Sequence, residues 1–133
     1  MTNNKTVVRH AEDAKPTPFP WGDIRWLFHR HLAADAEMTF GVVRIMAGEQ
    51  NPRHSHSNCE ELLYLLEGEI DHCVGDRRIH ATPGTLVRFP RNVEHHAENT
   101  GDKDALMVVC YSSPVRKTKT AAVLKRAGET RDS

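Results

Sequence analysis

Turn-forming residues recur at short intervals through the middle of the chain, and this spacing limits what the sequence can fold into. Groups of glycine, proline, asparagine and aspartate lie at Gly68 and within residues 75–78, 82–84, 90–92 and 99–104. The segments between them are too short for ordinary helices, and they are rich in β-branched or alternating residues. No helical period precedes residue 115. The sequence therefore predicts an all-β sandwich or closed barrel, in which sheet edges are removed or protected.

Further strands are expected before these turns. Residues 24–28 and 38–42 alternate apolar side chains with polar or small ones, and another strand is expected to contain His54 and His56. The run ELLYLLE, residues 61–67, is apolar on both parities from Leu62 to Leu66. Because alternate side chains of a strand point to opposite faces, we expect both faces of this strand to be covered.

The length of 133 residues fits one domain, since two would each have too little apolar surface to bury. Residues 1–18 are polar and contain two prolines, so we predict an extended N-terminal arm. Residues 19–114 are predicted to form the β-barrel. Residues 115–133 are basic and polar, and we predict that they form a short C-terminal tail.

Charge and cysteine content narrow the range of partners and compartments. Eighteen basic residues balance eighteen acidic ones, so no nucleic acid or anionic membrane partner is expected. No apolar run approaches the roughly 20 residues that span a bilayer, and the first 15 residues lack the apolar centre of a signal peptide, which predicts a cytoplasmic protein. Cys59, Cys73 and Cys110 form no C-x-x-C pair, which favours small buried thiols in a reducing compartment.

Two tight histidine clusters, His54 with His56 and His95 with His96, are the unusual feature of the composition. Residues two apart on a strand project to the same side about 7 Å apart, so His54 and His56 can reach one ion. Glu61 follows His56 at an odd step, and a turn within residues 57–60 is needed to bring it to the same side. Its neighbour Glu60 would then point to solvent or into a salt bridge.

A third imidazole is expected from the second histidine cluster, where parity allows only one of His95 and His96 to face the same interior. Three neutral imidazoles and one carboxylate suit a divalent iron, manganese, nickel, zinc or copper ion. Four protein ligands on a six-coordinate metal leave two positions open for a substrate or dioxygen.

The spacing of these residues resembles the two sequence motifs of the cupin superfamily. The matching positions are Gly48, His54, His56, Glu61 and Gly68 in the first motif, and Gly84, Pro90, His95 and Asn99 in the second. The resemblance extends over roughly residues 37–112. One position departs from it, because Asn92 stands where the family usually has glycine. Asparagine tolerates a left-handed backbone, so we expect the turn to be kept.

This resemblance implies a cupin jelly-roll β-barrel that binds one divalent transition metal ion per chain through His54, His56, Glu61 and His95. It selects Glu61 over Glu60 and His95 over His96. Four further residues are candidates for the lining of the cavity: Leu63, Leu65, His72 and Phe89. The two leucines share the parity of Glu61, whereas the parity of His72 and Phe89 is not settled by the sequence.

Proteins of this superfamily include dioxygenases, isomerases, lyases and non-enzymatic binders, so the resemblance leaves three hypotheses. We favour an iron-type dioxygenase, an oxidoreductase acting on a small oxygen-bearing metabolite. The alternatives are a redox-neutral metal-dependent lyase or isomerase, and a barrel that binds a small molecule without turnover. The resemblance also implies a homodimer. No catalytic residue beyond the metal ligands is identified.

Overall fold

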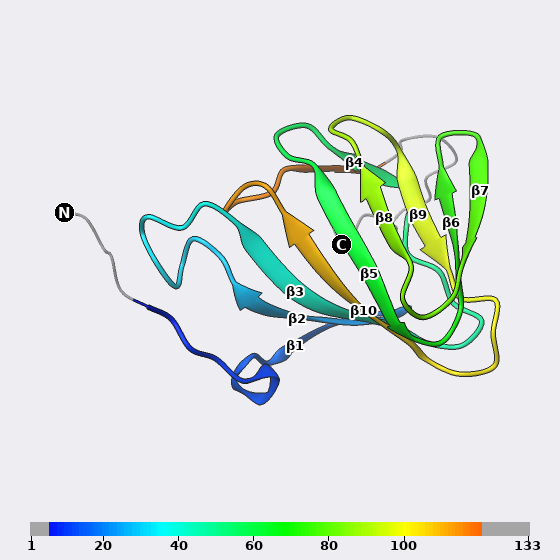
Figure 1. Ribbon diagram of the computed structural model, residues 1–133, viewed down its shortest axis with the longest axis horizontal. Coiled ribbons are helices and arrows are strands. Elements are labelled where there is room, and N and C mark those ends of the chain that lie inside the picture. The colour runs from blue at the N-terminus through cyan, green and yellow to red at the C-terminus, as the bar shows by residue number, and fades with distance from the viewer. Residues whose placement is uncertain (1–5, 121–133) are drawn as a thin grey trace.

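A computed structural model describes residues 6–120, which form two antiparallel sheets (Figure 1). The larger sheet has the strand order β1 (Pro16–Phe19), β2 (Gly22–Phe28), β3 (Thr39–Ile45), β10 (Ala105–Tyr111), β5 (Glu61–Glu67) and β8 (Leu86–Phe89). The smaller sheet has the order β11 (Thr118–Thr120), β4 (His54–His56), β9 (His95–Glu98), β6 (Ile70–Val74) and β7 (Arg77–Ala81). No helix among these residues is long and apolar enough to cross a membrane.

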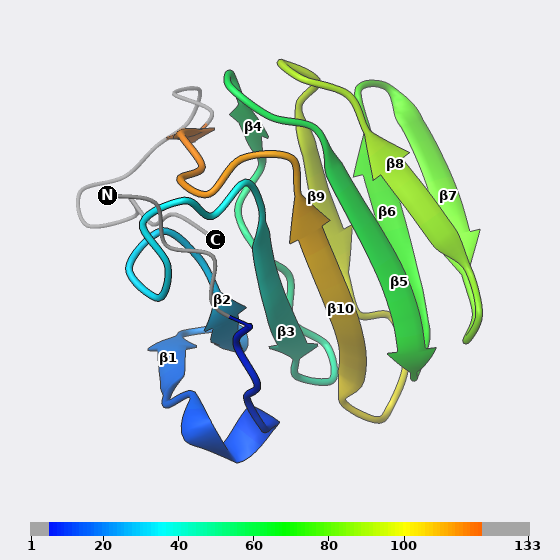
Figure 2. The ribbon, with the colours of Figure 1, turned by 60° about the vertical axis from the view of Figure 1, so that its left-hand side comes forward.

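The two sheets face each other (Figures 1 and 2). One apolar core is formed by residues from both sheets. Strand alternation supplies this core: in β10 the buried positions are Ala105, Met107, Val109 and Tyr111, and the residues between them are less buried. The prediction of an all-β jelly-roll barrel is confirmed. The interior between the sheets is therefore both the hydrophobic core and the place where inward polar side chains meet.

Two positions of the sequence motifs have a clear backbone role. Gly68 has φ +86°, and a Cβ placed there would lie 2.9 Å from both the Ala105 Cα and the Asp104 carbonyl oxygen, so only glycine fits the turn between β5 and β6. Asn92 has φ 70°, as expected for asparagine in place of the usual glycine. The departure from the family pattern thus preserves the turn that leads into β9.

Asn99, which follows β9, holds one end of the barrel together with its side chain. Its buried Nδ2 donates to the carbonyl oxygens of Ile45 at 2.9 Å and Lys103 at 2.8 Å. Its Oδ1 accepts a hydrogen bond from the Gly101 backbone at 2.9 Å. These bonds connect the end of β3 to the loop before β10, so the role of Asn99 is structural.

The outer face of β5 differs from the prediction. Leu62, Tyr64 and Leu66, with Leu86 on the adjacent β8, are between 40 and 57% exposed. The expectation that both faces of ELLYLLE are covered is wrong for residues 6–120, because the second sheet covers only the inward face and no described segment crosses the other. We call this exposed group the β5–β8 apolar face.

Both predicted extensions contribute strands. Pro16–Phe19 pairs with β2, although residues 1–18 are predicted to be an arm, and a 3-10 turn forms at Ala11–Asp13. The reason is that the Arg25 guanidinium donates to the carbonyl oxygen of Ala14 at 2.8 Å, which holds this segment against β2. Thr118–Thr120 of the predicted tail pairs with β4. The remainder of that tail, 121–133, lies outside the described residues.

Candidate metal centre

The structure brings His54, His56, Glu61 and His95 together inside the barrel, all of them buried. One potential ligand atom from each side chain lies within 4.8 Å of those of the other three. His54 and His56 occupy the two ends of the short strand β4, and His95 begins β9 directly opposite His54. Glu61 begins β5 in the other sheet, after the bend at residues 57–58 that the parity argument requires.

The rings of the three histidines are oriented by backbone carbonyl groups. The Nδ1 atoms of His54, His95 and His56 lie 2.7, 2.9 and 3.1 Å from the carbonyl oxygens of Pro52, Val93 and Lys117 respectively. A carbonyl oxygen only accepts, so each Nδ1 carries the proton and donates it. In the neutral ring the other nitrogen, Nε2, then presents its lone pair to the cluster, as a metal-binding imidazole requires.

These lone pairs converge on a carboxylate. The Glu61 Oε1 atom lies 3.1 Å from His95 Nε2 and 3.2 Å from His56 Nε2, and the buried His56 Nε2 has no hydrogen-bond partner. Acceptor atoms repel one another at this distance unless a proton or a cation lies between them. The donor set of three imidazole nitrogens and one carboxylate oxygen therefore fits a divalent transition metal ion.

The pKa values of these groups also favour the forms that bind a metal. Burial, together with the charge of His95, lowers the pKa of His54 to about 3, so this imidazole is neutral at pH 7. Burial alone would raise the pKa of the Glu61 carboxyl, but when a proton rather than a metal ion lies between Glu61 and its histidine neighbours, hydrogen bonds from His56 and His95 outweigh burial and hold that pKa below its usual range. Glu61 is thus an anion inside the barrel.

The two residues that the resemblance rejects lie outside this cluster. Glu60 forms an ion pair with Arg88 at 2.6 Å, on the outside of the barrel. His96 follows His95 with the opposite parity, and its Nε2 lies 2.9 Å from Glu98 Oε2.

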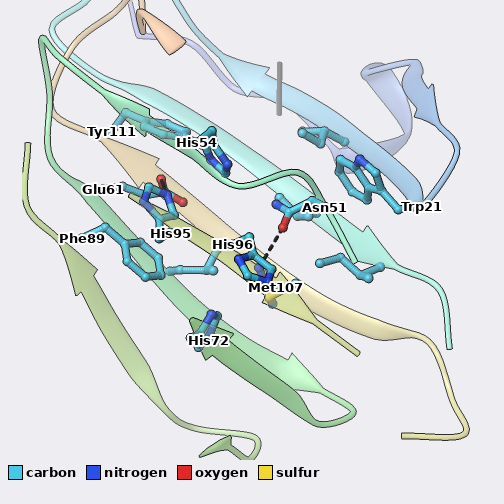
Figure 3. A pocket seen from close by; sticks show the side chains of 15 residues that line it. Trp21, Asn51, His54, Glu61, His72, Phe89, His95, His96, Met107 and Tyr111 are labelled. Carbon is cyan, nitrogen blue, oxygen red and sulfur yellow. Dashed lines mark hydrogen bonds and ion pairs between the residues drawn. The ribbon is translucent and has the colours of Figure 1, made fainter. Parts of the chain in front are cut away.

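A cavity of about 30 Å³ adjoins the cluster, room for about two water-sized groups. Of the four residues predicted to line it, Leu63, His72 and Phe89 do so. Leu65 is buried in the core and is absent from the lining, so its assignment is corrected: shared parity with Glu61 places it inward but farther along the strand. Figure 3 shows the labelled lining residues around this space.

The lining also contains residues that were not anticipated from the sequence, among them the polar or aromatic side chains of Trp21, Asn51, His96 and Tyr111. Tyr111 ends β10 on its inward parity and lies edge-on to His56, with ring centroids 5.1 Å apart. Burial raises the pKa of the Tyr111 hydroxyl well above its usual value, so this group stays protonated. Alternation along residues 105–111 could have identified Tyr111, whereas Trp21 and Asn51 lie outside the strands and carry no such signal.

A second group of potential ligands, Cys73, His96 and Glu98, lies on the outer side of the smaller sheet. Here the Arg78 guanidinium already donates to Glu98 Oε1 at 2.6 Å and to Cys73 Sγ at 3.4 Å. A fixed positive charge at this distance opposes the binding of a cation. The cluster is therefore an ion-paired surface feature rather than a second metal centre.

The fold and the cluster define a small antiparallel β-barrel with a buried three-histidine, one-glutamate candidate metal centre. The Cupin domain family matches residues 41–111, more than half of the chain. The protein belongs to the cupin family. The matched region contains all four clustered residues and every position of the two motifs.

Several relatives share this region. Protein SchB of Streptomyces halstedii is 28% identical over 108 residues, which covers 81% of this chain and 78% of SchB. Polyketide synthase CurC of Streptomyces cyaneus is 23% identical over 108 residues, covering 81% of this chain and 70% of CurC. Germin-like protein 1-1 of Oryza sativa subsp. japonica is 29% identical over 80 residues, which span 56% of this chain and 37% of that protein.

Solved structures show the same fold. The oxalate decarboxylase of Lactobacillus farciminis, in a formate complex, superposes with a TM-score of 0.76 at 21% identity and covers 84% of this chain. The S161A mutant of Bacillus subtilis oxalate decarboxylase OxdC gives a TM-score of 0.74 at 16% identity and covers 83%. This chain spans only 34% and 30% of those two proteins, so the likeness concerns the barrel alone.

Proposed function

We propose that this cupin is a metal-dependent enzyme that acts on a small oxygen-bearing metabolite, with an iron-type dioxygenase as the first candidate. The observation that carries the proposal is the convergence of three Nε2 lone pairs and the Glu61 carboxylate in the barrel interior. His54, His56, Glu61 and His95 would hold the metal. When bound, iron supplies Lewis acidity and one-electron redox chemistry at this position.

The chain itself contributes binding and orientation rather than a separate acid or base. Apart from Glu61, no carboxylate or lysine lines the cavity in the part of the chain that the structure describes. The carbonyl groups at the three Nδ1 atoms fix the imidazole rings, and the apolar walls exclude bulk water. This arrangement supports chemistry in which the metal does most of the work.

Elemental analysis of protein purified without added metal tests the centre. We expect close to one transition metal ion per chain, and the double substitution His54→Ala with His56→Ala should abolish it. His80→Ala, at an exposed histidine of β7, is the matched control and should leave the metal content unchanged. Full metal retention in the double variant would rule out the proposed centre.

A redox-neutral lyase or isomerase is the second candidate. It is supported by the structural neighbours, which are oxalate decarboxylases, including a Bacillus subtilis enzyme described with Mn(II) centres. Oxygen-electrode assays of the iron-loaded protein with small diketones, phenols and hydroxyketones separate the two candidates. Consumption of dioxygen with substrate supports the dioxygenase, whereas turnover without dioxygen uptake supports the lyase or isomerase. Binding without turnover would indicate a non-catalytic barrel.

We further propose that the protein acts in the cytoplasm as a homodimer. The β5–β8 apolar face supports the dimer, because leucines and a tyrosine gathered on one sheet face are costly to expose to water. A two-fold interface would pair this face with the same face of a second copy.

A further inference from the structure

Three residues that line the cavity have a buried ring nitrogen without a hydrogen-bond partner, namely Trp21, His72 and His96. His96 is bonded to Glu98 through its other nitrogen, whereas the side chains of Trp21 and His72 make no hydrogen bond within residues 6–120. Trp21 Nε1 and His72 Nδ1 are both fully buried without a hydrogen bond, on side chains that are 4% and 1% exposed. Buried donors and acceptors are almost always paired, because leaving one unpaired destabilises the fold. Apart from Asn51 and His96, the rest of the wall away from the cluster is apolar or aromatic. These two groups are therefore positioned for something that enters the cavity.

The two groups lie apart from the candidate metal centre. In Figure 3, Trp21 and His72 lie on different walls, each away from the group formed by His54, Glu61 and His95. Trp21 is held by parallel stacking on Phe19, with ring centroids 4.8 Å apart, and His72 lies edge-on to Phe89 at 5.6 Å. Both rings are thus fixed by packing, so their nitrogen atoms are preorganised to bind a ligand.

Neither group can compensate a negative charge. The indole Nε1 is a donor only, and burial lowers the pKa of His72 to about 4, which leaves its imidazole uncharged at neutral pH. No arginine or lysine lines the cavity among residues 6–120. A carboxylate at the far end of the cavity would lose its hydration without gaining a counter-charge, whereas a carbonyl or hydroxyl oxygen needs only a hydrogen bond.

We propose that Trp21 and His72 form a polar subsite for uncharged oxygens, and that the substrate is a hydroxy or oxo compound of a few heavy atoms with no charged group at its far end. The inference rests on the proposed function, in which the other end of the substrate lies at the metal. It excludes small dicarboxylates such as oxalate as the preferred ligand. The cavity of about 30 Å³ has to widen to admit such a molecule, and movement of the flexible Met107 side chain in its wall would provide the room.

A pair of probes that differ by one hydroxyl tests the subsite. Dihydroxyacetone has an oxygen beyond the hydroxyketone that would bind the metal, and hydroxyacetone lacks it. Binding to the cobalt-loaded protein is followed by the visible spectrum of the metal, with oxalate as the charged comparison. We expect the wild type to bind dihydroxyacetone about 10-fold more tightly than hydroxyacetone, the effect of one or two hydrogen bonds, and more tightly than oxalate.

The variants Trp21→Phe and His72→Leu should each reduce the preference for dihydroxyacetone several-fold, with an unchanged cobalt content. His72→Asn keeps a polar atom near the Nδ1 position and should restore part of the preference, which separates hydrogen bonding from packing. An unchanged ratio in both variants, or tighter binding of oxalate by the wild type, would overturn the subsite alone. A wild type that binds no metal would overturn the proposed function as well.

Discussion

His72 and His54 are neutral histidines inside the barrel, and both bear on how the protein responds to acid. Burial lowers the pKa of His72 to about 4 and, with the charge of His95, that of His54 to about 3. In the unfolded chain both would return to about 6.5 and bind protons more readily. A group with a lowered folded-state pKa contributes stability that is lost as the pH falls. Acid should therefore destabilise the metal-free protein from about pH 6.5 downward.

The substitution His72→Leu should make the stability of the metal-free protein depend less on pH. Urea denaturation of the metal-free protein at pH 7.5 and 4.5 measures it, and the loss of unfolding free energy on acidification should be smaller in the variant by roughly 2–3 kcal/mol. Protonation of His80 has the opposite effect on stability, because hydrogen bonding to Asp71 raises the pKa of His80 in the folded protein. His80→Leu should make the loss on acidification steeper. Parallel pH curves for the wild type and His72→Leu would refute the prediction.

The side-chain orientations that can be predicted from the sequence are those that depend only on the spacing of nearby residues. His54 and His56 share a face because they are two apart on a strand, and the bend at 57–58 brings Glu61 inward. The sequence does not predict whether His72 and Phe89 point into the barrel, because strand irregularities such as bulges shift the alternation of side chains. The register shift between Leu106 and Met107 is an irregularity of this kind.

Contacts between distant segments could not be predicted in this way. The place of Trp21 depends on its stacking with Phe19 and on a backbone bond from Met46, and no periodic pattern encodes either. Leu65 shows a second limit of prediction from the sequence. Its parity predicts that the side chain points into the barrel, but parity does not distinguish a residue of the cavity wall from a residue of the core. The sequence thus predicts the candidate metal ligands better than the rest of the cavity.

At the scale of elements, β5 and β8 present apolar side chains to solvent on one face and to the core on the other. The inward residues of β5, such as Leu63, are buried, whereas Tyr64 and Leu86 are exposed. Hydrophobic pattern alone cannot distinguish a strand covered by its own chain from one covered by another molecule. This ambiguity explains why the prediction that both faces are covered fails for a single copy.

The proposed homodimer can be tested on this face. Tyr64→Lys with Leu86→Lys places two positive charges on it and should shift the protein from dimer to monomer in sedimentation velocity. Both side chains are exposed in the single copy, so each barrel should remain folded by circular dichroism. Thr100→Lys, at an exposed position in another loop, is the control and should stay dimeric. A wild type that sediments as a monomer at all concentrations would exclude the homodimer.

At the scale of the whole molecule, the candidate metal centre joins the two sheets. Glu61 belongs to the larger sheet, and the three histidines belong to the smaller one. Between these ligands the sheets are connected by side-chain packing and loops rather than by a continuous ladder. A bound ion would therefore link both halves of the barrel through direct bonds, and its binding should be coupled to the stability of the fold.

Metal removal should lower the melting temperature. A ligand present at 1,000 times its Kd stabilises a fold by about 4 kcal/mol, which corresponds to a shift of roughly 10 °C or more in a domain of this size. Differential scanning calorimetry before and after treatment with a chelator measures the shift. Glu61→Ala should melt at the same temperature in both conditions. An unchanged melting temperature in wild-type protein that demonstrably loses metal would contradict the coupling.

The pairing of β11 with β4 has a consequence for how the centre is completed in the cell. His56 Nδ1 donates to the Lys117 carbonyl, and Thr118 lies opposite His56 in the smaller sheet. The ribosome delivers these residues well after His95, the last of the four candidate ligands. The ring of His56 is therefore not fixed until Lys117 and Thr118 have emerged, so metal acquisition follows the synthesis of these residues. Truncated chains that stop before Lys117 should retain all four ligands and still bind metal poorly.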